Sequence, residues 1–290
     1  MSTCAARVAL AGNPSDGYGG AVVAIPVHDL AAMASVTESD RFAVHTSNAD
    51  LRRLLTATAD AFAAQFELPS VTLSASTSIP RSVGLAGSSA LVIATLRALA
   101  AWTNHRWDPI DLAELALSVE RDRLDIAAGL QDRLVQAVGR PISMTFEPVG
   151  YHELSVPDGM TLFVAWNPHG SEPSDTVHRS LQRRFNGDDP PVKQAMVDLA
   201  VQAARARRAI EVGVHLLLSE AIDRSFDIRA SIIEIDATQR LLVDLGRAER
   251  AAVNSAGSGG SIVGLARRPT DIRALRSSYA KNGFEFLELD

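Results

Sequence analysis

The segment PRSVGLAGSSA, residues 80–90, places two glycines and two adjacent serines directly before a long apolar run. Gly84 and Gly87 allow the backbone to turn tightly and bring peptide N–H groups against a ligand, while Ser88 and Ser89 add hydroxyl groups where a helix begins. The dipole of that helix puts partial positive charge at the same end, which favours a phosphate group. A glycine turn followed by a serine helix cap would also explain these residues.

The patterns around this segment predict an α+β chain. Residues 89–102 are apolar on almost every side, which is typical of a helix buried within a domain. The polar stretch 171–191 predicts a flexible connection. We place a domain boundary near residue 150, which gives two α+β domains, 1–150 and 151–290. Apolar periodicity predicts strands at 6–11, 21–27, 70–75 and 161–166, and long helices at 191–221 and 228–247.

Bulk composition limits the classes of function. The 290 residues are 47% hydrophobic with a formal net charge of −6, so the chain lacks the basic field that binds nucleic acids or anionic membranes. Cys4 is the only cysteine, and the seven histidines show no metal-ligand spacing. The apolar run 8–10 is cut by Gly12 and Pro14, which predicts neither a signal peptide nor a membrane span. We therefore expect a cytoplasmic protein with a small-molecule substrate, and neither nucleic acid nor membrane as partner.

Three segments resemble the motifs of the GHMP kinases, named for galactokinase, homoserine kinase, mevalonate kinase and phosphomevalonate kinase. Residues 80–90 resemble the phosphate-binding motif, RVALAGNPSDGYGG at 7–20 the first motif, and NSAGSGG at 254–260 the third. Within the family, GNPSDG, the 80–90 segment and AGLQDR at 128–133 look most similar to glucuronokinase, which phosphorylates the anomeric hydroxyl of glucuronic acid. Two departures are Cys4-Ala5-Ala6 in place of the usual Ala-Pro-Gly, and Asn254 where the third motif often begins with lysine.

The resemblance implies two catalytic residues. Asp132 matches the family's catalytic aspartate at the start of a helix, where the helix dipole favours the ionised form that can accept or orient a hydroxyl proton. Arg7 matches the Lys or Arg of the first motif, which stabilises developing phosphate charge or lowers the pKa of the acceptor. By residue pattern alone, Asp132 could instead cap its helix and Arg7 could be a surface charge.

The resemblance also implies ATP and Mg²⁺ as cofactors. Mg²⁺ would be held by Ser89 and by Glu120, which lies twelve residues before Asp132. An ion pair between Glu120 and Arg123 at i,i+3 is the alternative. The implied nucleotide-binding residues are Pro80, Gly84, Leu85, Ala86, Gly87, Ser88, Ser89 and Ala90.

The implied substrate contacts are Asn13, Asp16, Gly257 and Gly259. Turn formation explains the same residues without a ligand, because Asn-Pro-Ser-Asp-Gly is a strong turn sequence. A uronate substrate also requires a cation for its carboxylate group. Arg81, Arg123 and Arg133 all lie in motif segments, and the sequence does not choose among them.

The fold implied is the two-domain GHMP kinase fold, with an N-terminal domain similar to domain 2 of ribosomal protein S5 and a ferredoxin-like C-terminal domain. The implied activity is that of an ATP- and Mg²⁺-dependent sugar kinase, acting on the anomeric hydroxyl of a uronic acid. Two alternatives stay open at this point. One is a kinase of the same family acting on a galactose-type sugar, an amino sugar or mevalonate, and the other is a non-catalytic sensor that binds ATP or a sugar.

Overall fold

The computed structural model describes residues 1–170 and 175–289, which form two compact units. The chain passes between the units several times, so each unit is assembled from separate stretches of sequence. Each is described here by itself. Unit one contains Met1–Arg7, Pro26–Ile79 and Ala86–Gly139, and unit two contains Val8–Ile25, Pro80–Leu85 and Arg140–Asp290.

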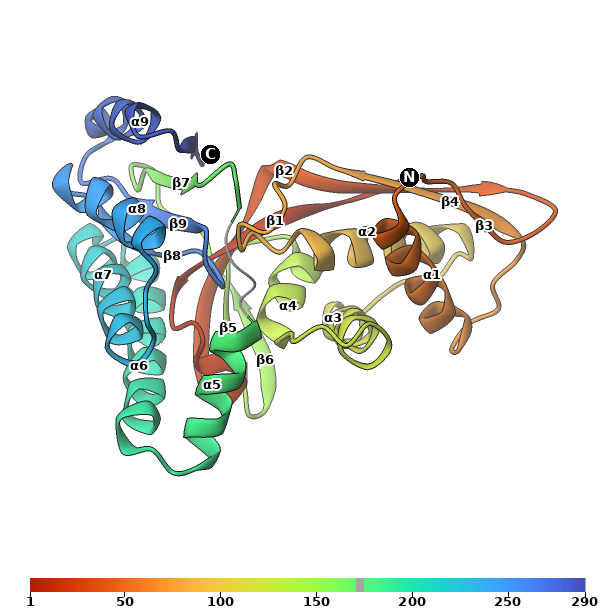
Figure 1. Cartoon of the computed structure of the whole chain (residues 1–290), viewed down its shortest axis with the longest axis horizontal. Coiled ribbons are helices and arrows are strands. Elements are labelled where there is room, and N and C mark those ends of the chain that lie inside the picture. The colour runs from red at the N-terminus through yellow and green to blue at the C-terminus, as the bar shows by residue number, and fades with distance from the viewer. Residues whose placement is uncertain (171–174, 290) are drawn as a thin grey trace. The chain divides into compact units, whose positions relative to one another are not determined.

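Unit one packs helices against a small sheet (Figure 1). The second half of β2 (Ala21–Glu38) pairs antiparallel with β4 (Val71–Thr77), and β3 (Ala43–Val44) pairs parallel with β4. β1 (Ser2–Ala11) pairs with β2. The helices are α1 (Ala49–Ala63), α2 (Gly87–Trp102), α3 (Pro109–Ser118) and α4 (Leu130–Val138), with one π-helical turn, η2 (Val119–Arg123), after α3.

Helix α2 lies in the core of unit one, as its apolar sequence predicts. It packs against α1, α3 and α4, and its buried residues lie on several sides of the helix. A helix that is apolar all round has no face for water, so it requires neighbours on every side. This burial fixes the position of the start of α2, where the 80–90 segment ends.

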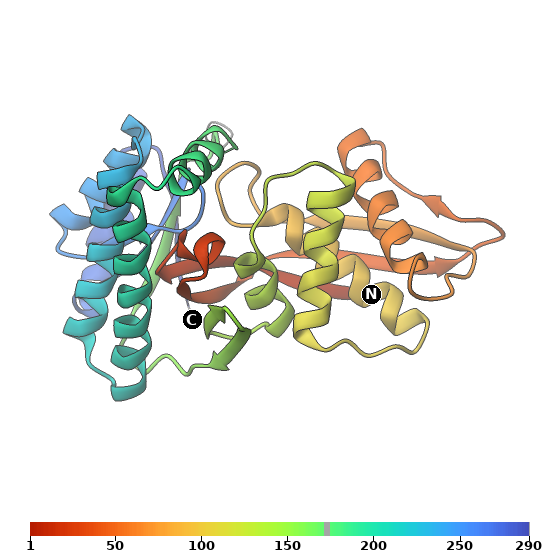
Figure 2. The same cartoon turned by 90° about the horizontal axis from the view of Figure 1, so that it is seen from below.

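Unit two contains a four-stranded antiparallel sheet in the order β10-β7-β9-β8. Helices α6 and α7 lie side by side in both views (Figure 1 and Figure 2). A hairpin of β5 and β6 pairs with the first residues of β2. The remaining elements are β5 (Ile142–Phe146), β6 (Val149–Glu153), β7 (Leu162–Trp166), α5 (Asp175–Asn186), α6 (Pro190–Val212), α7 (His215–Ile232), α8 (Ala237–Ala248), β8 (Ala252–Ser255), β9 (Ser261–Leu265), α9 (Ile272–Lys281) and β10 (Glu285–Glu288), with 3-10 turns η1 (Ser15–Tyr18) and η3 (Pro269–Asp271).

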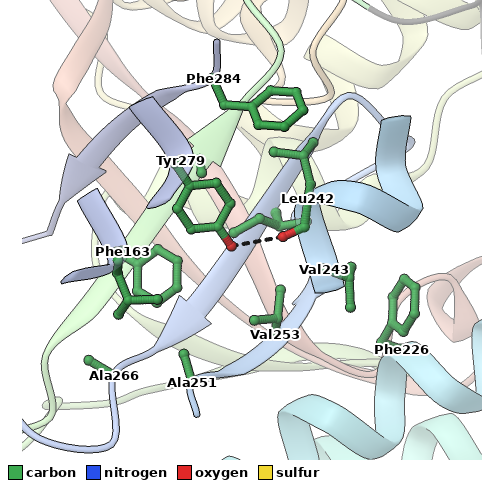
Figure 3. Packing of buried hydrophobic residues seen from close by; sticks show 12 residues of the cluster. Phe163, Phe226, Leu242, Val243, Ala251, Val253, Ala266, Tyr279 and Phe284 are labelled. Atoms are coloured by element: carbon green, nitrogen blue, oxygen red, sulfur yellow. Dashed lines mark hydrogen bonds between the residues drawn. The ribbon is translucent and has the colours of Figure 1, made fainter. Parts of the chain in front are cut away.

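One hydrophobic cluster, rich in aromatic rings, packs α7, α8 and α9 onto this sheet (Figure 3). The Tyr279 hydroxyl of α9 donates a hydrogen bond of 2.8 Å to the Leu242 carbonyl of α8, so the buried phenol has its polar atom satisfied. Phe163 of β7 and Val253 of β8 belong to the same cluster. Helix α8 is thereby fixed against β8 and β9, the two strands that flank residues 256–260.

The helical patterns of unit two end earlier than the sequence predicts. The predicted helix 191–221 is two helices, because Gly213 adopts a left-handed φ of +69° and ends α6. The predicted helix 228–247 is also divided, since Asp236 accepts a hydrogen bond from the Gln239 amide and starts α8. Of the predicted flexible connection 171–191, residues 171–174 lie outside the described residues, whereas the following stretch forms α5.

Within residues 1–170 and 175–289, none of the helices combines the length and the apolar character that crossing a membrane would require.

Candidate active site

Unit one brings the two predicted catalytic residues together. The Arg7 Nε atom on β1 donates a hydrogen bond of 2.6 Å to Oδ1 of Asp132, which lies in the first turn of α4. Gln131 Nε2 donates to the same oxygen at 3.0 Å. The other oxygen, Oδ2, accepts no side-chain hydrogen bond from the described residues, and Nη1 of Arg133 lies 3.6 Å from it, which is too far for a hydrogen bond. Asp132 is therefore held by one oxygen and offers the other.

The charge state of Asp132 follows from these neighbours. Burial by itself would raise the pKa of Asp132, but the charge and hydrogen bond of Arg7, with contributions from Arg133 and Gln131, lower that pKa from 3.8 to about 2. The opposite charge of Arg7 favours the ionised carboxylate. Asp132 is consequently an anion throughout the physiological pH range, and it is a weak base.

Glu120 forms a buried ion pair with Arg133, and not with Arg123 as the sequence alternative had it. Arg133 Nε donates to Glu120 Oε2 at 2.7 Å, Arg133 Nη2 donates to the same oxygen, and Nη1 donates to the Gly129 carbonyl at 2.8 Å. The predicted alternative partner, Arg123, is exposed. Arg133 is thus committed to Glu120 and to the start of α4, and the role of Glu120 as a metal ligand stays a prediction.

The start of α2 fits a phosphate group. The N-cap residue, Ala86, makes no side-chain cap hydrogen bond, and the Ser88 hydroxyl in the first turn is buried without a hydrogen-bond partner among the described residues. Uncapped N–H groups, the helix dipole and an unpaired hydroxyl together suit an anion. Ser89 and Glu120 supply oxygen atoms of the kind that Mg²⁺ prefers, so the residues present also fit the metal ion that accompanies a nucleotide.

The turn before α2 differs in detail from its prediction. The left-handed residues are Ser82, with φ +56°, Gly84, with φ +73°, and Ala86, with φ +61°, whereas Gly87 is the first helical residue. A Cβ atom on Gly87 would lie 3.3 Å from Ile79 Cγ2, a tight contact that a small shift of the Ile79 side chain would relieve. Leu85 and Ala90 are buried and Pro80 is half-buried, and the contacts of these three residues with a nucleotide stay predictions.

In unit two, the 80–90 segment packs against the third motif. A Cβ atom on Gly84 would lie 2.6 Å from the Gly259 carbonyl oxygen, and the Ser261 hydroxyl donates to the Val83 carbonyl at 2.5 Å. Two sequence motifs about 170 residues apart are therefore in backbone contact. The close approach leaves no room for a side chain at position 84.

Two buried side chains hold the 254–260 turn from behind. Arg229 of α7 donates to the carbonyls of Gly257 at 2.8 Å and Ser258 at 3.3 Å. Gln239 of α8 donates to Ser261 O at 3.1 Å and accepts a hydrogen bond from the Gly260 amide at 2.9 Å. Gly257 and Gly259 thus lie in a turn that the protein itself orders, and their role as substrate contacts stays a prediction.

The first motif is joined to the third by a pair of asparagines in unit two. Asn254 Nδ2 donates to Asn13 Oδ1 at 3.1 Å and to the Leu10 carbonyl at 3.2 Å, and Asn13 Nδ2 donates to the Ser255 carbonyl at 3.3 Å. Asn254, which stands where lysine was expected, therefore has a structural role here. Both polar atoms of Asn13 are engaged within the protein, and Asp16 lies half-buried in η1. Their substrate contacts stay predictions.

The sequence did not reveal four residues that support these groups. They are Gln131 and Gln136 on α4, Arg229 on α7 and Gln239 on α8. Gln136 had one visible signal, which is a polar residue in the apolar stretch that ends α4. Arg229 and Gln239 had none, since their partners lie 16 or more residues away along the chain.

Comparisons with known proteins show the family to which the chain belongs. A sequence model described as the GHMP kinases N terminal domain matches residues 53–140. The chain is 30% identical to a protein named Probable glucuronokinase 2 of Arabidopsis thaliana, with 96% of this chain and 88% of that protein aligned. It is 28% identical to Glucuronokinase 1 of the same plant over the same shares of the two chains.

The fold agrees with a solved structure as well. The crystal structure of the Streptococcus pneumoniae phosphomevalonate kinase superposes with a TM-score of 0.82 at 15% identity, covering 98% of this chain and 97% of the other. At that identity the likeness shows the fold alone. The α+β two-domain kinase fold expected from the sequence is confirmed, as is the family. The chain belongs to the GHMP kinases, and it is a sugar kinase that transfers a phosphoryl group to a hydroxyl.

Proposed function

We propose that this kinase phosphorylates the anomeric hydroxyl of a uronic acid, with ATP as phosphoryl donor and Mg²⁺ as its metal ion. The likeness to two glucuronokinases along 96% of the chain supports the choice of a uronic acid. The observation that carries the catalytic assignment is the geometry of Asp132, whose Oδ1 is held by Arg7 and Gln131 while Oδ2 is left to receive a hydroxyl group.

Asp132 acts by positioning and by charge. Its Oδ2 accepts a hydrogen bond from the sugar hydroxyl and directs a lone pair of that oxygen toward the phosphorus atom. With a pKa of about 2, the carboxylate does not remove the proton before the phosphorus–oxygen bond to the leaving group has largely broken. A loose transition state of this kind needs little base strength, so a weak but firmly ionised carboxylate is sufficient.

Arg7 keeps Asp132 ionised and holds its rotamer. The strong, short hydrogen bond from Nε prevents the carboxylate from turning Oδ1 toward the substrate. ATP bound at the start of α2 would supply the phosphoryl group, and Mg²⁺ would offset the charge of its phosphates. Ser88 and the N–H groups of α2 would bind the phosphates there, and Ser89 with Glu120 would hold the metal ion.

A uronate requires a cation that neutralises its carboxylate. Of the three arginines in motif segments, Arg133 is buried and committed to Glu120. Arg81 and Arg123 are both exposed, so we propose that one of these two contacts the substrate carboxylate. Asn13, Asp16, Gly257 and Gly259 of unit two stay the proposed contacts of the sugar hydroxyls.

A coupled assay of ADP release over a panel of acceptors tests the proposal. The panel contains glucuronate, galacturonate, glucose, galactose, an amino sugar and mevalonate. We expect turnover with a uronate, and a much larger loss of kcat/KM with the uronate than with the neutral sugar when Arg81 or Arg123 is changed to alanine. Turnover with galactose, an amino sugar or mevalonate and none with a uronate would refute the substrate. ATP binding without turnover of any acceptor would favour the sensor.

A further inference from the structure

Gln136 is a buried residue on α4 with every polar atom of its side chain in use. Its Nε2 donates two hydrogen bonds of 3.0 Å, to the carbonyls of Ala5 and Ala86. Its Oε1 lies 2.6 Å from the Ser89 hydroxyl oxygen. Only 1% of the residue is exposed, so water does not compete for these bonds. Gln136 therefore joins β1, the left-handed residue before α2, and the first turn of α2.

The orientation of the Gln136 amide is determined by its neighbours. Exchanging its nitrogen and oxygen would place Oε1 at 3.0 Å from the carbonyl oxygens of Ala5 and Ala86. Neither carbonyl oxygen carries a hydrogen, so neither could donate to Oε1. Two buried acceptor–acceptor contacts would replace two hydrogen bonds, and each unpaired buried group costs free energy. The oxygen of the amide therefore faces Ser89.

This orientation determines which way the Ser89 hydroxyl points. Gln136 Oε1 can only accept, so at 2.6 Å the Ser89 hydroxyl must donate its single hydrogen to it. The Ala86 carbonyl, at 3.1 Å from Ser89 Oγ, is the longer contact and already accepts from Gln136 and from the Ala90 amide. Ser89 is left with lone pairs and no hydrogen for any ligand at the start of α2.

The neighbouring serine has the opposite character. The Ser88 hydroxyl has no hydrogen-bond partner among the described residues, so its hydrogen is available to an anion. Phosphate oxygens are acceptors and suit Ser88, whereas a divalent cation takes oxygen lone pairs and suits Ser89. Two adjacent hydroxyls of identical chemistry are thus distinguished by one glutamine.

We propose that Gln136 is a positioning residue that makes Ser89 a ligand for the metal ion and prevents it from donating to phosphate, which is left to Ser88. The inference rests on the proposed function, since it assumes that a nucleotide and its metal ion bind at the start of α2. Donation to Gln136 also polarises the Ser89 oxygen and strengthens it as a ligand. Second-layer partners of this kind typically contribute about 10–100-fold to metal affinity.

Binding experiments without any acceptor sugar test the inference. The probes are Mn²⁺, followed by electron paramagnetic resonance in the presence of AMPPNP, and AMPPNP alone in EDTA, followed by calorimetry. We expect Gln136→Met and Ser89→Ala each to weaken Mn²⁺ binding by about 10–100-fold, with little change for AMPPNP in EDTA. The matched control, Ser88→Ala, should weaken AMPPNP in EDTA and leave the Mn²⁺ affinity of the nucleotide complex unchanged.

A double variant separates positioning from a general structural effect. If Gln136 acts through Ser89, Gln136→Met causes no further loss of Mn²⁺ affinity in the Ser89→Ala background. Gln136→Glu keeps an acceptor for the Ser89 hydroxyl but loses both donors, so it should regain Mn²⁺ affinity relative to Gln136→Met. A role confined to Ala5 and Ala86 predicts the reverse, because a carboxylate repels both carbonyls.

Two results would overturn the inference while leaving the proposed function intact. One is that the losses of Mn²⁺ affinity in Gln136→Met and Ser89→Ala add in the double variant. The other is that Gln136→Met weakens AMPPNP binding equally with and without the metal ion. A wild-type protein that binds no AMPPNP would overturn the proposed ATP site and the inference together. Should neither Gln136 variant fold, as judged by circular dichroism, the serines decide: a greater loss of Mn²⁺ affinity in Ser88→Ala than in Ser89→Ala overturns the inference, and the opposite order supports it.

Discussion

Gly84→Ala is the most direct test of the contact between the 80–90 segment and the 254–260 turn in unit two. Gly84 has φ +73°, and a Cβ atom there would lie 2.6 Å from Gly259 O, 3.1 Å from Gly259 N and 3.2 Å from Ser258 N. All three neighbours are backbone atoms, which cannot rotate away as the end of a side chain can. Either the 254–260 turn or the start of the phosphate-binding segment must move.

The expected magnitude has two parts. An alanine in the left-handed conformation costs about 1 kcal/mol. Overlap with a packed neighbour adds about 1–3 kcal/mol. Gly283→Ala is the matched control, because Gly283 belongs to the same unit, has φ +79° and has nothing within 4 Å of its ideal Cβ. Gly283→Ala should therefore show the first part alone, and Gly84→Ala should show both.

Differential scanning calorimetry and AMPPNP titration measure the two consequences. For a chain of this size about 1 kcal/mol corresponds to roughly 2–4 °C in Tm, so we expect that loss for Gly283→Ala and roughly two to four times as much for Gly84→Ala. AMPPNP affinity should fall in Gly84→Ala and not in Gly283→Ala. Equal losses of Tm with unchanged affinity in both would show that Gly84 does not pack against Gly259.

Three further outcomes are expected. Asp132→Asn should lower kcat by about 10²–10⁴-fold in the ADP-release assay while AMPPNP affinity is unchanged, because the amide keeps the shape and loses the charge. Because the pKa of Asp132 is lowered from 3.8 to about 2 in the folded state, its carboxylate stabilises the fold fully above about pH 4, and this stabilisation is lost as the pH falls toward about 2. The free energy of unfolding of the wild type should therefore fall by about 2 kcal/mol more across this range than that of Asp132→Asn. Glu120→Gln leaves the Arg133 charge buried and should destabilise by about 3–5 kcal/mol in urea unfolding, whereas Glu153→Gln, in an exposed pair with Arg140, should change stability by less than about 1 kcal/mol.

The local features of the candidate site could be predicted because each is written in a short stretch of sequence. The start of α2 follows from the glycines and serines of the 80–90 segment, and Arg7 and Asp132 were singled out through the resemblance of their segments to family motifs, whereas the contact between the two was not predicted. The choice of Arg133 over Arg123 as the partner of Glu120 could not be predicted in this way. The i,i+3 rule assumes a regular helix, and η2 is a π-helical turn that ends at Arg123, so Glu120 meets a residue of the next helix instead.

The backbone conformation of the turn before α2 was the second feature that the sequence did not predict correctly. Glycine is the default residue for left-handed turns, so the sequence assigned the turn before α2 to Gly84 and Gly87. In the structure Ala86, and not Gly87, is left-handed, a conformation that costs an alanine about 1 kcal/mol or more when nothing holds it. The hydrogen bond from Gln136 Nε2 to the Ala86 carbonyl stabilises that conformation. This hydrogen bond joins residues 50 positions apart, so no local sequence pattern predicts it.

Helix α4 carries the functions of unit one on a single short element. Residues four apart lie on the same face of a helix, so Asp132 and Gln136 project from one side of α4, whereas Arg133, the next residue, projects about 100° away. The first face meets Arg7 of β1 and Ser89 of α2, and the second is braced by Glu120 of η2. A displacement of α4 would therefore move together the Asp132 carboxylate, which we propose orients the acceptor, and the Gln136 amide, which we propose directs the Ser89 hydroxyl. If these proposed roles hold, metal affinity and turnover are coupled through the position of α4, and the buried pair of Arg133 and Glu120 helps to fix that position from the second face.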